Sequence, residues 1–110
     1  MSRSRRRDRG HKSFVMIPRK MLKSKEWKGL SASAKLFYIY LKGKYNGQNN
    51  GEIRLYYSEL DGVKGLSSPS TKSKAIRELE DKEWIRRTQL GGLYRKSNDF
   101  ELTGKYDDYL

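Results

Sequence analysis

Hydrophobic residues recur at helical spacing in residues 31–42. Apolar side chains return every three or four positions, at Leu30, Ala34, Phe37, Tyr38 and Leu41. This rhythm predicts a helix, with Ser31 as its N-cap and Gly43 as its stop. Other apolar residues widen the stripe around most of the helix, namely Leu36, Ile39 and Tyr40. We therefore expect this helix in the middle of the domain.

A second helical pattern follows a turn at residues 66–69. Ser68 is a favourable N-cap, and Pro69 suits the first helical position because the N–H that it lacks has no intrahelical partner there. Three apolar side chains then fall on one side of the helix, at Ala75, Ile76 and Leu79. We expect the helix to run through Lys82.

Alternation of apolar and polar residues indicates strands. Residues 52–56 alternate and predict a short strand, and Ser58 can cap a brief helix at residues 58–63. Two longer strands are expected at residues 84–90 and 93–102. Gly91-Gly92 between them is typical of a two-residue hairpin turn.

The chain before the first long helix is less regular. Residues 14–18 are a short apolar extended segment that ends at Pro18. Residues 19–29 contain Met21, Leu22 and Trp27, and we expect them to form a short helix or an ordered loop that packs on the body of the domain.

The composition excludes most catalytic and metal chemistry. The chain has no cysteine and a single histidine, His11. Disulfides, thiolate or multi-histidine metal sites and imidazole catalysis are therefore not expected, nor is a cofactor or a small-molecule substrate. The acidic residues near the second helix form a charge-pairing pattern, so we do not expect an enzyme; they are Glu78, Glu80, Asp81 and Glu83.

No apolar run approaches the roughly 20 residues that span a bilayer, and no signal peptide is apparent. We expect a soluble, cytoplasmic protein without a membrane partner. Its net charge of +12 favours a polyanion as partner. Residues 1–12 carry six basic and one acidic side chain, residues 13–30 five and one, and residues 31–50 three and none. Residues 51–110 carry eleven of each sign, so the N-terminal half holds the whole excess.

Residues 1–12 are expected to form a disordered basic arm, because residues 2–9 contain nothing apolar to bury. The arm either contacts phosphates, as in a minor groove, or is a solvated tail or a localisation signal. Its candidate DNA-binding residues are Arg3, Arg5, Arg6, Arg7 and Arg9.

The outer face of the second helix combines small hydroxyls with long cations. Its candidate DNA-binding residues are Ser70, Thr71, Ser73, Lys74 and Arg77. Hydroxyl and ammonium groups bind phosphates, and a guanidinium can bond guanine through two donors. The alternative is an ordinary solvated face, on which the cations pair with the neighbouring acids Glu78, Glu80 and Asp81.

The predicted hairpin carries a second group of cations. If Gly91-Gly92 forms its turn, Arg87 lies opposite Lys96, and like charges so placed destabilise a sheet unless an external anion compensates them. A phosphate-contacting wing would have this pattern. Its candidate DNA-binding residues are Arg86, Arg87, Arg95 and Lys96.

Several short motifs occur in a characteristic joint order. They are Phe14-Val15-x-Ile17-Pro18, Leu30-Ser31-x-x-Ala34-Lys35-x-x-Tyr38, Asn49-Asn50-Gly51-Glu52-Ile53, Ser70-Thr71-x-x-x-Ala75-Ile76-x-Glu78-Leu79-Glu80, Trp84-Ile85, Gly91-Gly92 and Phe100-Glu101-Leu102-Thr103. Together they resemble the winged helix-turn-helix domains of bacterial, phage and plasmid proteins, among them replication initiator and primosomal proteins and small regulators.

The resemblance implies an α+β fold in which a three-helix core carries a small β-sheet and a two-stranded wing. The domain would span residues 13–103, between the basic arm at 1–12 and a flexible tail at 104–110. The resemblance also implies double-stranded DNA as partner, with the second helix in the major groove and the wing on the flanking backbone. Replication initiation or transcription regulation would be the setting.

Two residues depart from the family pattern. Lys72 stands where an apolar residue is usual, so the first turn either packs less well or lays the alkyl stem along the core with the ammonium outside. Glu83 stands where glycine commonly ends the helix. It either adopts a left-handed conformation, at a cost of about 1 kcal/mol, or continues the chain directly into the strand.

Two other functions fit the sequence. One is a protein-interaction or self-association module, as a homodimer or with a replication or transcription protein, because tyrosine is favoured at interfaces. The tyrosines concerned, which can equally be core and rim residues, are Tyr38, Tyr40, Tyr45, Tyr56 and Tyr57. The other is a basic RNA-binding protein, although the aromatic sheet signature of common single-strand RNA modules is absent.

Overall fold

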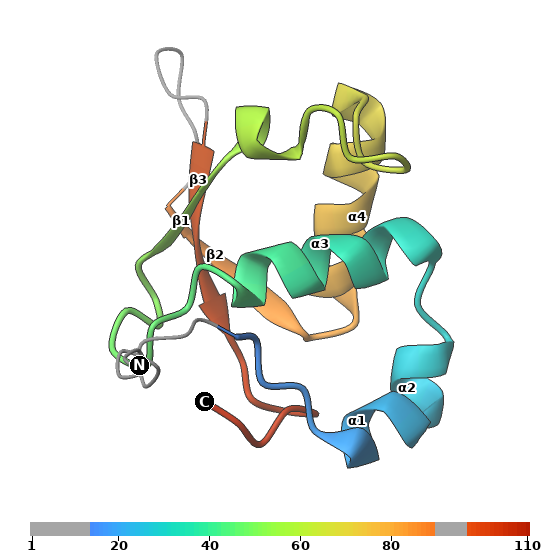
Figure 1. The fold of residues 1–110 in the computed structure, drawn as a ribbon, viewed down its shortest axis with the longest axis vertical. Coiled ribbons are helices and arrows are strands. Elements are labelled where there is room, and N and C mark those ends of the chain that lie inside the picture. The colour runs from blue at the N-terminus through green and yellow to red at the C-terminus, as the bar shows by residue number, and fades with distance from the viewer. Residues whose placement is uncertain (1–13, 90–96) are drawn as a thin grey trace, which may run out of the picture.

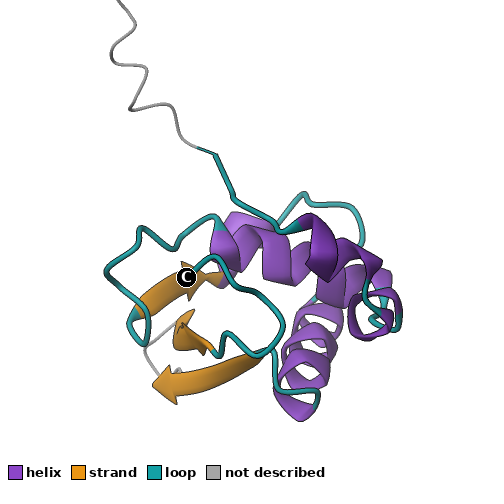
Figure 2. Ribbon diagram, turned by 90° about the horizontal axis from the view of Figure 1, so that it is seen from below, coloured by secondary structure: helices purple, strands orange, loops and turns teal. Residues whose placement is uncertain are grey.

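The helix expected in the middle of the domain lies at its centre (Figure 1). The computed structural model describes residues 14–89 and 97–110. In chain order its elements are α1 (Arg19–Lys23), α2 (Lys25–Lys28), α3 (Ala32–Lys42), β1 (Ile53–Tyr56), the 3-10 helix η2 (Tyr57–Leu60), α4 (Pro69–Asp81), β2 (Ile85–Gln89) and β3 (Ser97–Leu102). The expected α+β class is confirmed, with the strands gathered on one side and the helices on the other (Figure 2).

The core forms where α3 meets α4 and the sheet. The Ser31 hydroxyl accepts a hydrogen bond from the Ala34 N–H at 3.2 Å, so Ser31 is the N-cap as expected. The apolar side of the helix is buried, and the ring of Phe37 packs edge-on against that of Phe100 from β3, with 5.6 Å between centroids. Burying such side chains is the main favourable contribution to folding.

The three strands form an antiparallel sheet in the order β1-β3-β2. Alternate residues of β1 are buried, Ile53 and Leu55, and they are joined in the core by Phe100 and Leu102 of β3. This alternation confirms the short strand that the period-two pattern predicts.

The pairing of β2 with β3 differs from the predicted hairpin register. The observed partners are Ile85 with Leu102, Arg86 with Glu101 and Arg87 with Phe100. The predicted pairing of Arg87 with Lys96 is therefore wrong by four positions, while Gly91-Gly92 lies outside the described residues. The predicted register would put Ile85 opposite the polar Asn98. In the observed register apolar residues face each other and opposite charges face each other, and both kinds of pair stabilise the sheet.

The shorter elements refine two expectations. Residues 19–29 form the two short helices α1 and α2, which bury Met21 and Trp27. The brief helix expected at residues 58–63 is instead the single 3-10 turn η2. Glu59 rather than Ser58 caps the backbone at the start of this turn, because a carboxylate oxygen of Glu59 accepts a hydrogen bond from the Tyr56 N–H at 3.0 Å. Within the described ranges, no helix has the length and apolar character needed to cross a membrane.

Helix α4 ends in a left-handed residue that is not glycine. Glu83 has a φ of 66°. The Trp84 N–H donates to the Leu79 carbonyl at 2.8 Å and the Glu83 N–H to the Glu80 carbonyl at 3.0 Å. These two bonds form a Schellman motif, which requires a left-handed conformation at the residue after the C-cap, here Glu83. The helix therefore does not run directly into the strand.

Replacing Glu83 by glycine should stabilise the domain by about 1 kcal/mol, because glycine adopts this conformation without strain. The substitution also removes the ion pair between Glu83 and Lys105. Their side chains are 63% and 50% exposed, and exposed ion pairs contribute little to stability. Urea unfolding would measure the gain. Glu83→Ala is the matched control, since it loses the same ion pair and keeps the strain. An equal stability of the two variants would contradict this explanation.

The C-terminal residues 104–110, expected as a flexible tail, are anchored to α3. One carboxylate oxygen of Asp107 accepts hydrogen bonds from the Tyr38 hydroxyl and the Lys42 ammonium, each at 2.5 Å. The other accepts from the Tyr109 N–H at 3.0 Å. Asp107 is only 2% exposed. A buried carboxylate persists only when it is paired and hydrogen-bonded, so these contacts tie the end of the chain to the core.

This network makes stability sensitive to alkaline pH. Burial of Tyr38, its hydrogen bond to Asp107 and the negative charge of Asp107 all raise the pKa of Tyr38 far above its ordinary value. Above about pH 10 the unfolded chain releases the Tyr38 proton and the folded protein retains it, so the unfolded state is favoured.

We expect Tyr38 to lower the free energy of unfolding by about 1.4 kcal/mol per pH unit above pH 10. Urea unfolding at pH 9 to 11.5 would measure this slope. Tyr38→Phe has nothing to ionise at this position, so its slope should be shallower by this amount, although its stability at pH 7 is lower. Parallel slopes for the two proteins would show that Tyr38 ionises normally in the fold.

Candidate nucleic-acid interface

Helix α4 is held in place by its cap and by one apolar side. The Ser68 hydroxyl accepts a hydrogen bond from the Thr71 N–H at 3.2 Å, and Pro69 occupies the first turn, as expected. The apolar side is buried against α3 and the sheet, through Ala75, Ile76 and Leu79. The opposite side of the helix is consequently turned outward.

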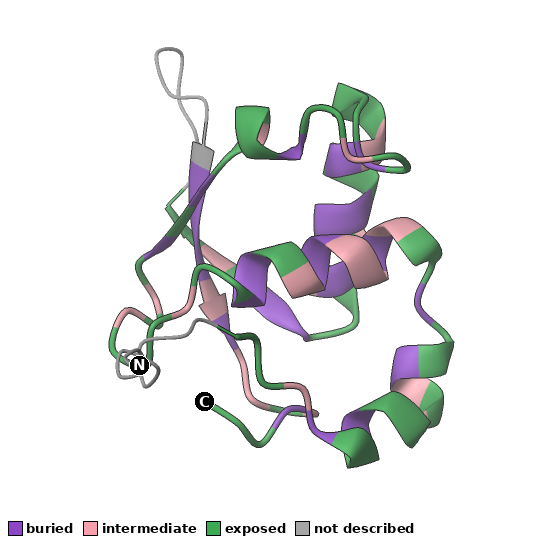
Figure 3. Ribbon diagram, in the orientation of Figure 1, coloured by how far each residue is buried: buried purple, intermediate pink, exposed green. Residues whose placement is uncertain are grey.

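The outer face of α4 contains the residues that the sequence predicted for it. Four of them are exposed, namely Ser70, Ser73, Lys74 and Arg77. Thr71 is half-buried, and its hydroxyl oxygen accepts a hydrogen bond from the Ser68 hydroxyl at 2.7 Å. Figure 3 shows how the exposed face continues to the start of α4. The hydroxyl of Thr71 is thus partly engaged in the cap.

Lys72 differs from the other basic residues of α4 because its side chain is buried. The sequence predicted either poorer packing of the first turn or an alkyl stem along the core with the ammonium outside. The side chain is 7% exposed, and its ammonium donates to a carboxylate oxygen of Asp61 at 2.5 Å. Asp61 directly follows η2 and remains 65% exposed. The ion pair therefore joins the loop before α4 to its first turn, and the charge of Lys72 is compensated within the fold.

The acids of α4 do not neutralise the cations of its outer face. Glu80 forms two hydrogen bonds with Arg87, at 2.7 and 2.9 Å. Asp81 lies four residues after Arg77, a spacing that allows pairing, yet no ion pair joins them. Within the described part of the chain, Lys74 and Arg77 form no ion pair at all. The ion pairs expected for the solvated-face alternative are therefore not observed for these two cations among the described residues.

Glu78 fixes the position of α4 on α3. Its two carboxylate oxygens accept from the Ser31 N–H at 2.8 Å and the Ser31 hydroxyl at 2.7 Å. Burial raises the pKa of Glu78, but the hydrogen bonds from Ser31 and the nearby Lys82 outweigh it, so the pKa is lower than its ordinary value. The charged form of Glu78 is thus the one that joins the two helices.

Two of the four predicted wing cations are paired with carboxylates, and the other two lie outside the described residues. Arg86 donates to a Glu101 carboxylate oxygen at 2.8 Å, and Arg87 is bound by Glu80, a hydrogen bond that raises the pKa of Arg87. Both are therefore compensated within the domain. Arg95 and Lys96 lie outside the described residues, as do all the arm arginines: Arg3, Arg5, Arg6, Arg7 and Arg9.

Several elements meet at the end of the molecule where α4 begins. Figure 1 shows the start of α4, the turn η2 and the start of β3 at this same end. The loop between η2 and α4 adds Lys64, which is exposed and forms no ion pair with the described residues. The sequence did not indicate Lys64, because the residues around it show no periodicity that would place it on the same face as the outer residues of α4.

A larger group of cations was also missed. Helices α1 and α2 carry five exposed basic residues, namely Arg19, Lys20, Lys23, Lys25 and Lys28. The excess charge of residues 13–30 is visible in the sequence, but helices of five and four residues are too short for their exposed sides to be read from periodicity. In the described ranges no group of three or more His, Cys, Asp or Glu side chains could hold a metal ion.

Comparison with models of protein families, with curated proteins and with solved structures finds no match in any of the three. The support for a function therefore comes from the side chains of this chain. Its most specific feature is the outer face of α4, where two cations remain uncompensated beside small hydroxyls.

Proposed function

We propose that this chain is a double-stranded DNA-binding protein that inserts the outer face of α4 into the major groove. The observation that carries the proposal is the state of Lys74 and Arg77. Both are exposed and without an ion pair among the described residues, whereas the neighbouring Lys72, Arg86 and Arg87 are compensated by carboxylates. An α-helix fits the width of the major groove, and free cations there can bind the nucleic acid.

The side chains of this face differ in what they can recognise. Arg77 can donate two parallel hydrogen bonds to guanine O6 and N7, which distinguishes guanine from the other bases. The ammonium of Lys74 binds a phosphate as a point charge, and Ser70 and Ser73 can bond phosphates or base edges. Sequence preference would therefore depend chiefly on Arg77, and affinity on all of them.

The order of elements supports a winged helix-turn-helix arrangement. Helix α3 is followed by β1, η2 and α4, and then by β2 and β3. In such an arrangement the last helix enters the major groove and the hairpin lies against the flanking backbone. Because Arg86 and Arg87 are bound by carboxylates, the wing would contribute through Arg95 and Lys96. Replication initiation or transcription regulation in a bacterium or a mobile element is the setting that the resemblance implies.

Selection of bound sequences from random duplexes tests this function. We expect one enriched motif that contains a guanine. A palindromic motif would indicate that two protein molecules bind together. Gel shifts at increasing salt would then measure the number of phosphate contacts. Deleting residues 2–9 should reduce the salt dependence without altering the motif. Recovery of random sequences, or stronger binding to an RNA hairpin than to any duplex, would contradict the proposal.

A second candidate function is self-association or docking of a partner protein. Tyr38 is buried, and Tyr45 and Tyr57 are half-buried, but Tyr40 and Tyr56 are 43% and 47% exposed. Exposed tyrosines are common at protein interfaces. Sedimentation over a concentration series, with and without duplex, separates the two functions. A dimer without affinity for DNA at moderate salt would favour the interaction module.

A further inference from the structure

Helices α1 and α2 present a dense group of uncompensated positive charges. Residues 19–28 contain five basic residues and one acid, Glu26. All five cations are exposed, and none forms an ion pair with the described residues. We call this group the α1–α2 surface; it consists of Arg19, Lys20, Lys23, Lys25 and Lys28.

The α1–α2 surface is firmly attached to the domain. Met21 is 1% and Trp27 8% exposed, and the ring centroid of Trp27 lies 5.6 Å from that of Trp84 and 5.9 Å from that of Tyr38. Ser24 joins the two helices, since its hydroxyl accepts from the Trp27 N–H at 3.1 Å and donates to the Met21 carbonyl at 2.7 Å. The backbone positions from which the cations project are therefore held in a defined arrangement.

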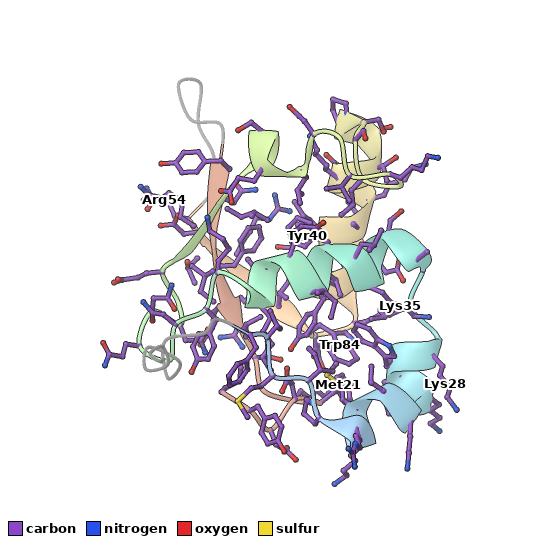
Figure 4. All side chains as sticks on the ribbon, in the orientation of Figure 1. Met21, Lys28, Lys35, Tyr40, Arg54 and Trp84 are labelled. Atoms are coloured by element: carbon purple, nitrogen blue, oxygen red, sulfur yellow. The ribbon has the colours of Figure 1, made fainter. Side chains whose placement is uncertain are left out.

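Cations elsewhere on the described surface are mostly compensated. Lys44 pairs with Glu59, Arg54 with Asp99 and Lys105 with Glu83. Uncompensated cations are concentrated on the outer face of α4, with Lys64 before it, and on the α1–α2 surface, with Lys35 beside it. Figure 4 shows Lys28 and Lys35 at the same edge of the molecule. The positive potential of such a group attracts anions, phosphates among them.

The start of α4 and the α1–α2 surface lie at opposite ends of the domain, whereas the last turn of α4 approaches the end of α2, where the Lys82 ammonium donates to the Gly29 carbonyl at 3.2 Å. Figure 1 shows α1 and α2 at the end away from the start of α4. DNA is stiff over the length of one small domain. A duplex that lies across the start of α4 would therefore have to bend to reach the α1–α2 surface, whereas a second duplex reaches it freely.

We propose that the α1–α2 surface binds the phosphate backbone of a second DNA duplex, so that one molecule bridges two duplexes. This inference rests on the proposed function of α4. Lysine side chains bind phosphates as point charges and read no base edges, so binding at this surface is independent of sequence and strongly dependent on salt.

The test uses short duplexes that are too stiff to wrap around the protein. One population contains the motif selected by α4 and a donor fluorophore, and the other has an unrelated sequence and an acceptor. Energy transfer reports two duplexes on one complex, and the shift of the donor duplex alone reports binding through α4. Sedimentation of each complex gives the number of protein molecules in it.

The decisive variant is Lys20→Gln/Lys23→Gln/Lys28→Gln, and the matched control is Lys44→Gln/Lys82→Gln/Lys105→Gln. Both remove three positive charges from exposed lysines, but those of the control are paired with carboxylates in the fold. We expect the first variant to weaken capture of the acceptor duplex at least about tenfold and to lower its salt slope by about three. Binding of the donor duplex should change much less. Thermal unfolding would show that both variants fold.

Several outcomes would overturn the inference. If wild-type protein binds the donor duplex without energy transfer, the second surface does not exist although α4 binds DNA. If both variants lower energy transfer equally, capture of the second duplex does not depend on the cations of the α1–α2 surface in particular. If the bridged complexes contain two protein molecules, a protein dimer joins the duplexes. If no duplex binds at all, the proposed function of α4 fails together with this inference.

Discussion

Asp107→Ala should destabilise the folded domain by about 3–5 kcal/mol, the usual cost of removing one partner of a buried ion pair. Asp107 and the side chain of Lys42 are 2% and 3% exposed, and 2.5 Å separates the Lys42 ammonium from the carboxylate oxygen. Without the carboxylate, a charged ammonium would remain in the core with no counter-charge. The same substitution removes the acceptor of the Tyr38 hydroxyl.

Urea unfolding at pH 7 would measure this loss. Asp107→Asn keeps an acceptor but removes the charge, so it should fall between wild type and Asp107→Ala. Tyr38→Phe/Lys42→Met/Asp107→Leu replaces the ion pair and the hydroxyl bonded to it by apolar groups, so that no buried polar side chain of this network is left without a partner, and should recover most of the stability. A loss below about 1 kcal/mol for Asp107→Ala, the range of exposed ion pairs, would mean that residues 104–110 are not anchored in this way.

Arg77→Ala should remove about 1–3 kcal/mol of discrimination at one base pair of the DNA site. Arg77 is exposed and forms no ion pair among the described residues, so its guanidinium is available to bond a base. Lys74→Ala should instead weaken binding to all duplexes alike and reduce the salt slope by about one, as expected for a phosphate contact. Both variants should keep the stability of the wild type within about 0.5 kcal/mol, because neither side chain is packed.

Binding of each variant to the selected motif and to its single-base changes would test these assignments. Lys44→Ala is a suitable control, because Lys44 is paired with Glu59 and is not a residue of α4. If Arg77→Ala lowers affinity for every sequence by the same factor, Arg77 contacts phosphate and the base-reading assignment is wrong. If Lys74→Ala changes the preferred base, the two roles are exchanged.

Local interactions explain why the helices could be predicted from the sequence. The caps of α3 and α4, Ser31 and Ser68, act on backbone groups three residues away, and the buried side of each helix follows from its 3.6-residue period. The left-handed conformation of Glu83 was among the predicted alternatives for the same reason. The outer face of α4 could be predicted as well, because it is the side opposite the apolar residues.

The sequence by itself thus determined the two long helices α3 and α4, the three strands, the α+β class and the side chains on the outer face of α4. Only the tertiary structure decided which charges are compensated. Arg86 is bound by Glu101 because β2 and β3 pair in a register set by core residues. Arg87 is bound by Glu80 because α4 packs beside β2, and Asp107 reaches Lys42 from 65 residues further along the chain. A period or a cap is a local property, whereas an ion pair between distant residues depends on the packing of the whole domain. For that reason the uncompensated cations of α4 and of the α1–α2 surface could be recognised only in the folded molecule.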